Sequence, residues 1–346
     1  MERTELGRSG TRVSAWCLGT MTYGTQTPPE DAHRQLEMAR DAGIDFLDTA
    51  EMYPVNPARA ETLGRTEEIL GDWFARTGRR DEWVVATKIL GPSGLARDGA
   101  GVTPETVREA VEGSLRRLRT DRIDLYQFHW PNRGSYHFRQ NWGFDPSGQD
   151  PAEVADHMAE VMDALKALVA EGKIGAFGLS NDSAWGATRW CDAAERAGGP
   201  RPLAVQNEYS LLCRLYDTDL AEAARQEGFT LLAYSPLAAG LLTGKYHGGE
   251  RPEGSRAAVN GNLGGRWTDR ALAAAAAYAA LARTHGLDPV HMALAFTRQR
   301  PFSCVPIVGA SSAAQLAHML GGADLVLEDD VLEGIDALHR AHPMPY

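Results

Sequence analysis

Four side chains suited to proton transfer follow short apolar runs of the chain. They are Asp48, Tyr53, Lys88 and His129. A phenol with an ordinary pKa of about 10 is a poor acid near neutrality unless its anion is stabilised. An adjacent Lys88 ammonium would favour the phenolate, so we expect it to lower the pKa of Tyr53. Asp48 would pair with this lysine, and His129 would donate a hydrogen bond to a substrate carbonyl.

Together, these four side chains could protonate a developing alkoxide. It contains no nucleophile paired with a base, which argues against hydrolysis. Each residue also has an ordinary alternative, since Asp48 could cap a helix and Lys88 could lie on the surface. A barrel isomerase or aldolase that uses Lys88 as a Schiff base also stays open, and it would need no nicotinamide.

The chain that must position these residues alternates between short apolar runs and helical patterns. The runs predict strands at Ala15–Leu18, Phe46–Asp48, Val84–Thr87, Ile123–His129, Ile174–Leu179, Leu203–Gln206, Thr230–Tyr234 and Val305–Val308. The helical patterns between them include Pro29–Ala42, Thr66–Arg76, Pro104–Arg119, Ala152–Glu171, Ala184–Ala197 and Leu220–Gln226. Strands that alternate with helices predict a parallel sheet.

A closed (β/α)8 barrel, the TIM barrel, is the predicted fold. The number of runs matches the eight strands of that barrel. The GxGxxG pattern, which an open dinucleotide-binding sheet would carry after an early strand, occurs nowhere in the chain. No linker divides the sequence, so we predict one domain over 1–346. Polar residues at the carboxyl ends of successive barrel strands would then converge at one rim.

Two long insertions interrupt the alternation. The segment Asn132–Asp150 is rich in aromatic residues and follows the fourth predicted strand. The segment Gly248–Gly265 is rich in glycine and arginine and follows the seventh. Long loops of this kind are typical of lids or binding loops, although tolerated surface insertions are the alternative.

Composition narrows the class of protein further. The net charge of −11 argues against nucleic acid as a partner, because binding phosphate backbones needs clustered lysine and arginine. The first residues show no apolar stretch of a signal peptide, and Ala271–Ala282 is too weak a run to span a bilayer. The four cysteines lack ligand or disulfide spacing. We expect a cytoplasmic protein, and the sequence does not indicate its oligomeric state.

Several motifs in order resemble those of the aldo-keto reductase superfamily. The catalytic motifs are Asp48-Thr49-Ala50-Glu51-Met52-Tyr53, Ala86-Thr87-Lys88 and Gln127-Phe128-His129-Trp130. The cofactor motifs are Gly178-Leu179-Ser180-Asn181, Val205-Gln206-Asn207, Ala233-Tyr234-Ser235-Pro236-Leu237, Leu242-Thr243-Gly244-Lys245-Tyr246 and Val308-Gly309-Ala310-Ser311. The resemblance runs from about Leu6 to the end of the chain. Within the superfamily, the Tas-like branch is most similar to Ala50–Val55 and to the loop after His129.

The resemblance implies a catalytic tetrad and an NADP(H) site. Asp48, Tyr53, Lys88 and His129 would be the tetrad, with Tyr53 donating the proton. The nicotinamide end would be held by Ser180, Asn181 and Gln206 with Tyr234 stacked on the ring, and Gly19, Thr20 and Met21 would also contact the cofactor. The pyrophosphate path would be lined by Ser235, Pro236, Leu237, Gly240 and Lys245. The adenosine half would meet Gly309, Ser311 and Gln315, and Arg256 is the candidate for the 2′-phosphate.

One position departs from the family pattern. Many relatives carry Glu-Asn shortly after the glutamine that corresponds to Gln315, and here that place reads His318-Met319. This departure concerns the contacts to adenosine and the preference for NADP over NAD.

Two further groups of residues have possible site roles. Tyr23, Met52, Trp130 and Tyr209 are candidates to line the substrate pocket, with core packing as the alternative. His157 with Glu160, and His339 with His342, have helical spacing for a metal. No third ligand is evident for either pair, so we expect solvated helix faces and no metal.

The leading functional hypothesis is an NADPH-dependent oxidoreductase. It would reduce an aldehyde or ketone, or oxidise the corresponding alcohol or sugar, with a small molecule as its partner. The alternative is an NADPH-binding regulatory subunit that turns over slowly and acts through a protein partner. The sequence names neither the substrate nor the preferred direction.

Overall fold

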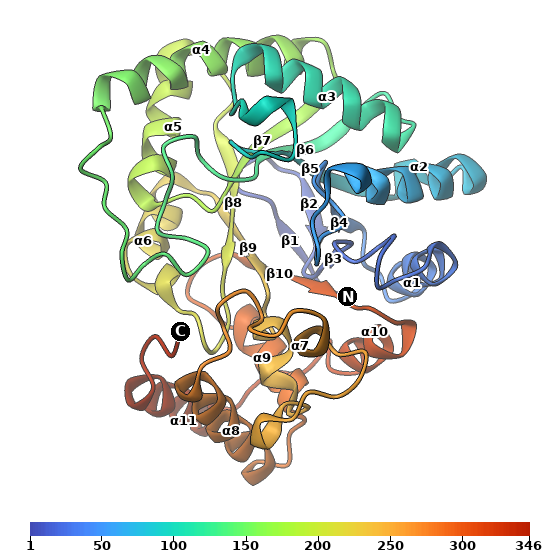
Figure 1. Cartoon of the computed structure of the whole chain (residues 1–346), viewed down its shortest axis with the longest axis vertical. Helices are drawn as coiled ribbons and strands as arrows, with labels where there is room; N and C mark the ends of the chain where they lie inside the picture. The colour runs from blue at the N-terminus through green and yellow to red at the C-terminus, as the bar shows by residue number, and fades with distance from the viewer.

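A computed structural model describes residues 1–346 and contains a closed ring of parallel strands (Figure 1). Around the ring the strands are β10 (Cys304–Gly309), β3 (Cys17–Gly19), β4 (Phe46–Asp48), β5 (Val84–Ile89), β6 (Ile123–Phe128), β7 (Ile174–Ser180), β8 (Pro202–Glu208) and β9 (Thr230–Tyr234). Every neighbouring pair is parallel, and β10 closes the ring against β3. The predicted (β/α)8 barrel is therefore confirmed.

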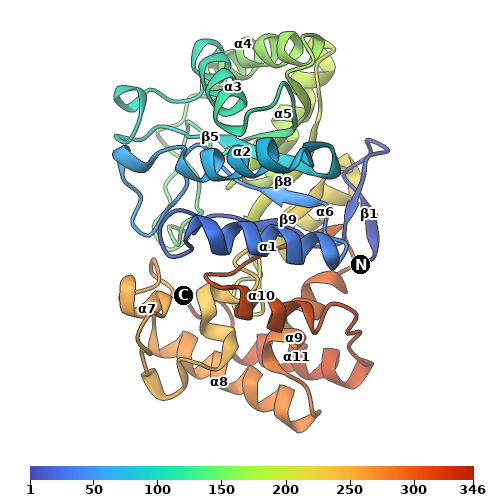
Figure 2. The ribbon, with the colours of Figure 1, turned by 90° about the vertical axis from the view of Figure 1, so that its right-hand side faces the viewer.

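Helices surround this ring and connect its strands (Figures 1 and 2). Those between consecutive strands are α1 (Pro29–Asp41), α2 (Arg65–Thr77), α3 (Pro104–Leu118), α4 (Pro151–Ala170), α5 (Ala184–Ala197) and α6 (Asp219–Glu227). Between β9 and β10 lie α7 (Arg256–Val259), α8 (Asp269–Thr284) and α9 (Pro289–Arg298), and α10 (Ala313–Leu320) and α11 (Asp329–Ala341) follow the last strand. No helix combines the length and apolar character needed to cross a membrane.

The predicted strand positions agree with the observed ones, with small shifts at their ends. β4 and β9 have the predicted bounds, whereas β5 continues two residues beyond Thr87 to Ile89. Lys88 is therefore part of the strand itself, paired in register with Gln127 on β6. Pairing with β6 on one side and a hydrogen bond from the Glu51 N–H to the Lys88 carbonyl on the other fix the backbone from which this buried side chain reaches its partner.

A hairpin at the start of the chain was not predicted. β1 (Arg3–Glu5) and β2 (Arg12–Ser14) form a two-stranded antiparallel sheet that is separate from the barrel. These strands have three residues each and are charged, so the apolar-run criterion does not detect them. Leu6 and Val13 pack with residues from the barrel strands in one buried cluster and thereby close that end of the barrel.

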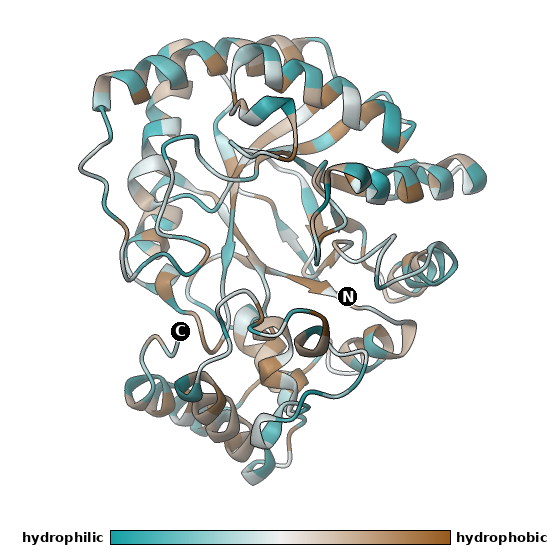
Figure 3. Ribbon diagram, in the orientation of Figure 1, coloured by the Kyte–Doolittle hydropathy of each residue, from teal (hydrophilic) through white to brown (hydrophobic).

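The core has two parts because strand side chains alternate between the two faces of the ring. Inside the barrel lies a cluster of 10 buried apolar residues, among them Phe46, Ala86 and Val305. Between the strands and the helices lies a cluster of 72. Figure 3 shows hydrophobic residues alternating with hydrophilic ones around the outer helices, as expected for helices with one buried face. This packing holds the strand ends, and with them the polar residues of the rim.

Candidate active site

A buried ion pair joins β4 to β5 at the carboxyl end of the barrel. The Lys88 ammonium is 2.7 Å from Asp48 Oδ2 and donates a second 2.7 Å hydrogen bond to the carbonyl oxygen of Thr49. The side chains of Lys88 and Asp48 are 0% and 3% exposed. A charge removed from water in this way is tolerated only when it is paired and hydrogen-bonded. The predicted pairing of Asp48 with Lys88 is present in the structure.

Two glutamines complete the hydrogen bonding of the aspartate. Gln206 on β8 donates a 2.8 Å hydrogen bond to Asp48 Oδ1, and Gln127 on β6 donates a longer one of 3.4 Å. Thr20, which follows β3, donates from its hydroxyl to the backbone carbonyl of Asp48 at 2.9 Å. Side chains from β5, β6 and β8 thus contact this carboxylate, and Thr20 holds its backbone.

Tyr53 and His129 stand beside the ion pair. The phenolic oxygen of Tyr53 is 3.5 Å from the Lys88 ammonium, which also lies 4.9 Å from the centre of the tyrosine ring. The rings of Tyr53 and His129 meet edge to face with their centres 5.8 Å apart. Both side chains keep 8% exposure, and His129 Nδ1 is buried without a hydrogen-bond partner. The structure therefore brings all four predicted catalytic residues together.

The protonation states at this cluster follow mainly from burial. Burial raises the pKa of Tyr53 well above its usual value, and the nearby Asp48 carboxylate raises it further. The pKa of Tyr53 is thus raised, whereas the position of Lys88 led us to expect a lowered one, and the cation that opposes the rise is Arg256. Burial lowers the pKa of Lys88, although the Asp48 carboxylate opposes this effect. Burial also lowers the pKa of His129 well below its usual range. At neutral pH the site presents a protonated phenol and an uncharged imidazole.

The residues expected at the nicotinamide end form one hydrogen-bonded chain. The Ser180 hydroxyl donates to the carbonyl oxygen of Gln206 at 2.8 Å, and the Asn181 amide donates to the carbonyl oxygen of His129 at 2.9 Å. The hydroxyl of Tyr234 donates to Asn181 Oδ1 at 2.8 Å. These residues end β7, β8 and β9, so their convergence follows from the order of the strands. They lie directly beside the catalytic group.

Two backbone positions at this rim are unusual. Asn181 and Ser235 have φ values of 52° and 53°, in the left-handed region that residues other than glycine seldom occupy. Both follow the last residues of barrel strands. Such conformations persist only where the surrounding structure enforces them, and they concentrate at functional sites.

Among the cations in the segment after β9, Lys245 and Arg256 are two that have no carboxylate partner. Lys245 and Arg256 take part in none of the ion pairs of the chain, and Arg256 Nε is buried without a hydrogen-bond partner. Burial, together with the nearby Arg266, lowers the pKa of Arg256 to about 10. Gly240, over which Lys245 passes, has a φ of 98°, a backbone conformation that favours glycine. Unpaired positive charge at such a place suits an anionic ligand.

The remaining expected cofactor residues occupy three places on the same rim. Ser235, Pro236 and Leu237 follow β9, while Gly19 ends β3 and is followed by Thr20 and Met21. Gly309 ends β10, and Ser311 donates from its backbone and its hydroxyl to Gln315 Oε1 at 3.0 and 3.1 Å. Ser311 and Gln315 flank the start of α10, where the N–H of Ala313 donates to the Asp31 carboxylate and the N–H of Gln315 donates to the Ser312 hydroxyl.

The departure from the family pattern, His318-Met319, lies further along α10. Met319 is 5% exposed and packs in the core, so it does not face a ligand. His318 is half exposed and its Nε2 lies 3.0 Å from Asp288 Oδ2. The residue that replaces the expected glutamate is therefore engaged with α9.

Sequence reasoning missed a second buried charge cluster at the end of β8. Glu208 binds Arg266 through two hydrogen bonds of 2.6 and 2.8 Å and binds Arg139 at 2.9 Å. The hydroxyl of Tyr346, the last residue, donates to the same carboxylate at 2.9 Å. Glu208 thus joins the insertion after β6, the segment after β9 and the C-terminus. The only signal in the sequence is that Glu208 directly follows Gln206-Asn207.

Of the four candidates for the substrate pocket, two lie in the core instead. Tyr23 and Tyr209 are both 0% exposed. The hydroxyl of Tyr23 donates to Gln35, and that of Tyr209 donates to Asp217 at 2.6 Å. Met52 precedes Tyr53, and Trp130 has its ring centre 5.0 Å from that of His129. The aromatic side chains of Tyr23 and Tyr209 are therefore removed from the pocket, whereas Met52 and Trp130 stay beside the catalytic group.

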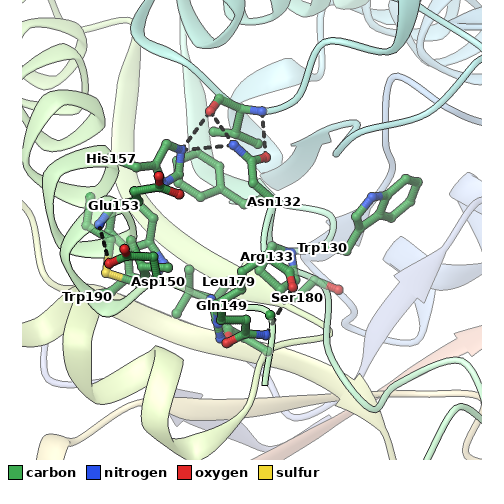
Figure 4. Close-up of a pocket in the computed structure, with 17 residues that line it drawn as sticks. Trp130, Asn132, Arg133, Gln149, Asp150, Glu153, His157, Leu179, Ser180 and Trp190 are labelled. Atoms are coloured by element: carbon green, nitrogen blue, oxygen red, sulfur yellow. Dashed lines mark hydrogen bonds and ion pairs between the residues drawn. The ribbon is translucent and has the colours of Figure 1, made fainter. Parts of the chain in front are cut away.

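A cavity of about 340 Å³ lies next to the site, beneath the insertion 132–150 (Figure 4). Its wall combines Trp130 and Ser180 from the rim with Glu153 and His157 from α4. None of the four catalytic residues lines it. Asn132, Arg133, Gln149 and Asp150 of the insertion contribute to the lining, so this loop encloses a cavity rather than extending freely into solvent.

Comparison with known proteins identifies the class. The profile of the Aldo/keto reductase family matches residues 15–340. The chain belongs to this family and is an oxidoreductase of it. It is 40% identical to "Protein tas" of Escherichia coli (strain K12), over 100% of this chain and 99% of that protein.

Two other relatives are similar over nearly their whole lengths. "Uncharacterized oxidoreductase YrpG" of Bacillus subtilis (strain 168) is 33% identical over 96% of this chain and 94% of that protein. "Probable voltage-gated potassium channel subunit beta" of Oryza sativa subsp. japonica is 30% identical over 99% and 98%.

The buried ion pair predicts strong coupling between two substitutions. Lys88→Met leaves Asp48 charged and buried without its partner, which should lower the free energy of unfolding by about 3–5 kcal/mol. Adding Asp48→Asn removes the uncompensated charge, so the double variant should lose much less than the sum of the single losses. Urea unfolding of the four proteins, followed by fluorescence, measures this. Additive losses would contradict the coupling.

The low pKa of His129 predicts a dependence of stability on pH. Below about pH 6.5 the unfolded chain takes up a proton that buried His129 does not, so the folded state loses stability as pH falls. Each such histidine contributes a slope of up to about 1.4 kcal/mol per pH unit. His129→Gln should reduce the measured slope between pH 6.5 and 5 by one such contribution, determined from urea unfolding at several pH values. An unchanged slope would show that His129 protonates freely in the folded protein.

Proposed function

We propose that this protein is an NADPH-dependent reductase of an aldehyde or ketone, which also catalyses the reverse oxidation of an alcohol or sugar. The observation that carries the proposal is the protonated phenol of Tyr53, 3.5 Å from a buried ammonium and next to an uncharged imidazole. These three groups meet at the rim of the barrel. They can bind and protonate a carbonyl oxygen, and no nucleophile with its own base accompanies them.

Each catalytic side chain has a distinct task. Tyr53 donates its proton to the oxygen of the carbonyl group as negative charge develops there. Lys88 stabilises the phenolate that results, and its own charge is held by Asp48. His129 stays uncharged and donates an N–H to the same oxygen, which orients the substrate. Trp130 and Met52 stand beside this position and would contact the rest of the substrate.

The residues present fit a nicotinamide cofactor with several phosphates. Lys245 and Arg256, which have no carboxylate partner, suit the phosphates, and Gly309, Ser311 and Gln315 are the residues assigned to the adenosine half. Ser180, Asn181 and Gln206 lie where the carboxamide would reach the catalytic group. When bound, NADPH supplies the hydride. We assign Arg256 to the 2′-phosphate because its guanidinium is partly buried and has no acidic partner.

The first test of this proposal removes the phenolic oxygen. Tyr53→Phe should lower turnover of small aldehydes by about 10²–10⁴-fold, which is the usual contribution of a positioned general acid. NADPH binding should stay nearly unchanged, because the phenol acts on the substrate. Oxidation of NADPH, followed by its absorbance over a panel of aldehydes and ketones, gives the rate, and fluorescence titration gives the affinity.

A matched control is Tyr23→Phe, which removes a phenolic oxygen that is bonded to Gln35 in the core. It should leave the rate largely intact. If Tyr53→Phe kept the wild-type rate, Tyr53 would not be the proton donor. Borohydride trapping of Lys88 with a carbonyl substrate would instead support the isomerase or aldolase alternative.

The second test concerns the choice of cofactor. Losing a hydrogen bond to a charged group costs about 1.5–3 kcal/mol, so Arg256→Met should weaken NADPH about tenfold to 150-fold and leave NADH almost unaffected. Arg251→Met is the control, because Arg251 belongs to the same segment but stacks on Trp267. Fluorescence titration with both cofactors measures the affinities. Equal weakening of NADPH and NADH would place Arg256 on a phosphate that both share.

A second candidate function is a cofactor-binding subunit of a larger assembly. The similarity to a rice protein named as a probable potassium channel β subunit favours it. Such a subunit would bind NADPH tightly, turn over slowly and co-purify with a partner. The same NADPH oxidation assay distinguishes the two candidates, because steady turnover of a small carbonyl compound identifies the enzyme.

A further inference from the structure

Asp288, His291 and His318 are the one group of three potential metal ligands that the fold brings together. One donor atom from each lies within 4.8 Å of the other two. Asp288 and His291 belong to the start of α9, and His318 belongs to α10, 30 and 27 residues later. The site is separate from the catalytic group and is formed by two helices outside the barrel.

The carboxylate of Asp288 is oriented before any ion binds. Its Oδ1 accepts hydrogen bonds from the backbone N–H groups of Val290 at 2.8 Å and His291 at 3.2 Å, and so caps α9. This leaves Oδ2 directed at His318 Nε2, 3.0 Å away. A ligand whose other oxygen is already fixed loses little conformational freedom when it binds a metal.

The ring of His291 is held in a similar way. Its Nε2 lies 2.7 Å from the carbonyl oxygen of His318. A carbonyl oxygen can only accept, so Nε2 carries the hydrogen and Nδ1 keeps its lone pair for a metal. A backbone carbonyl of this kind is the usual second partner of a metal-bound histidine.

Gly322 provides the space for that ring. A Cβ at Gly322 would lie 2.3 Å from His291 Cγ, so any other residue would displace the imidazole. The side chains of Asp288 and His318 are 34% and 53% exposed, which leaves the donors open to an ion from solvent. The cluster therefore combines fixed donors with a direct path of entry.

We propose that Asp288, His291 and His318 bind a divalent transition-metal ion, with zinc as the best fit. Two imidazole nitrogens and one carboxylate oxygen suit zinc, whereas magnesium and calcium prefer oxygen ligands alone. A water molecule completes four-coordination. The ion ties α9 to α10 and replaces the hydrogen that His318 shares with Asp288. The sequence analysis predicts no metal, because it finds no third ligand for His157 with Glu160 or for His339 with His342. It does not consider the three residues of this cluster.

The test measures zinc binding to the full chain, freed of metal by chelation and carrying no histidine tag. Titration against a zinc indicator should show one Zn²⁺ per chain, and zinc should raise the melting temperature while Mg²⁺ does not. His318→Gln should weaken binding about tenfold or more and abolish the stabilisation by zinc. Asp288→Asn, which keeps the helix cap, should also weaken it.

His285→Gln is the matched control. His285 pairs with Asp330 at 3.4 Å on the surface and has no third ligand nearby, so its loss should leave zinc binding unchanged. The catalytic residues are untouched in all these variants, and binding is measured without turnover. Absence of stoichiometric zinc binding, or binding that neither His318→Gln nor Asp288→Asn weakens, would overturn the proposal.

Discussion

The buried contact between the Lys88 ammonium and the Asp48 carboxylate is the constraint on which the rest of the site depends. Neither charge is stable in the barrel without the other, and both need further polar partners. Those partners, Gln127 and Gln206, come from β6 and β8, so the pair is satisfied only when the ring of strands is complete. The candidate catalytic residues thus depend on contacts from several strands of the barrel.

The rim around this rigid group is held by a second buried charge. Glu208 gathers Arg139, Arg266 and Tyr346 from three segments that are distant in the sequence. The insertion after β6, the segment after β9 and the C-terminus are therefore fixed to the same strand end that carries Gln206. These segments border the proposed substrate and cofactor positions, while Lys245 and Arg256 in the same region lack acidic partners. The arginines that join these segments to Glu208 are thus neutralised, whereas the cations that we propose to bind the cofactor have no acidic partner.

The pKa of Tyr53 is shifted upward, whereas a phenol activated by a nearby ammonium would have a lowered pKa. Burial and the Asp48 carboxylate outweigh the opposing charge of Arg256, so the pKa of the phenol is raised and the phenol keeps its proton. A general acid must be protonated when the substrate arrives, and a high pKa ensures this over the physiological range. In the proposed reaction, Lys88 contributes when the proton leaves Tyr53 and phenolate charge appears. The low pKa of His129 acts in the same direction, because an uncharged imidazole does not compete with Lys88 for that charge.

The sequence by itself determined the alternation of strands and helices, the barrel and the convergence of Asp48, Tyr53, Lys88 and His129, because parallel strands in a closed ring bring their carboxyl ends to one rim. The family follows from the catalytic and cofactor motifs, which occur along this chain in the order typical of the aldo-keto reductases. Only the tertiary structure decided side-chain direction. It placed Tyr23 and Tyr209 in the core, joined Glu208 to residues 58 and 138 positions away, and set His318 against Asp288. Such contacts depend on how helices and loops pack around the barrel, and local residue patterns carry no information about that packing.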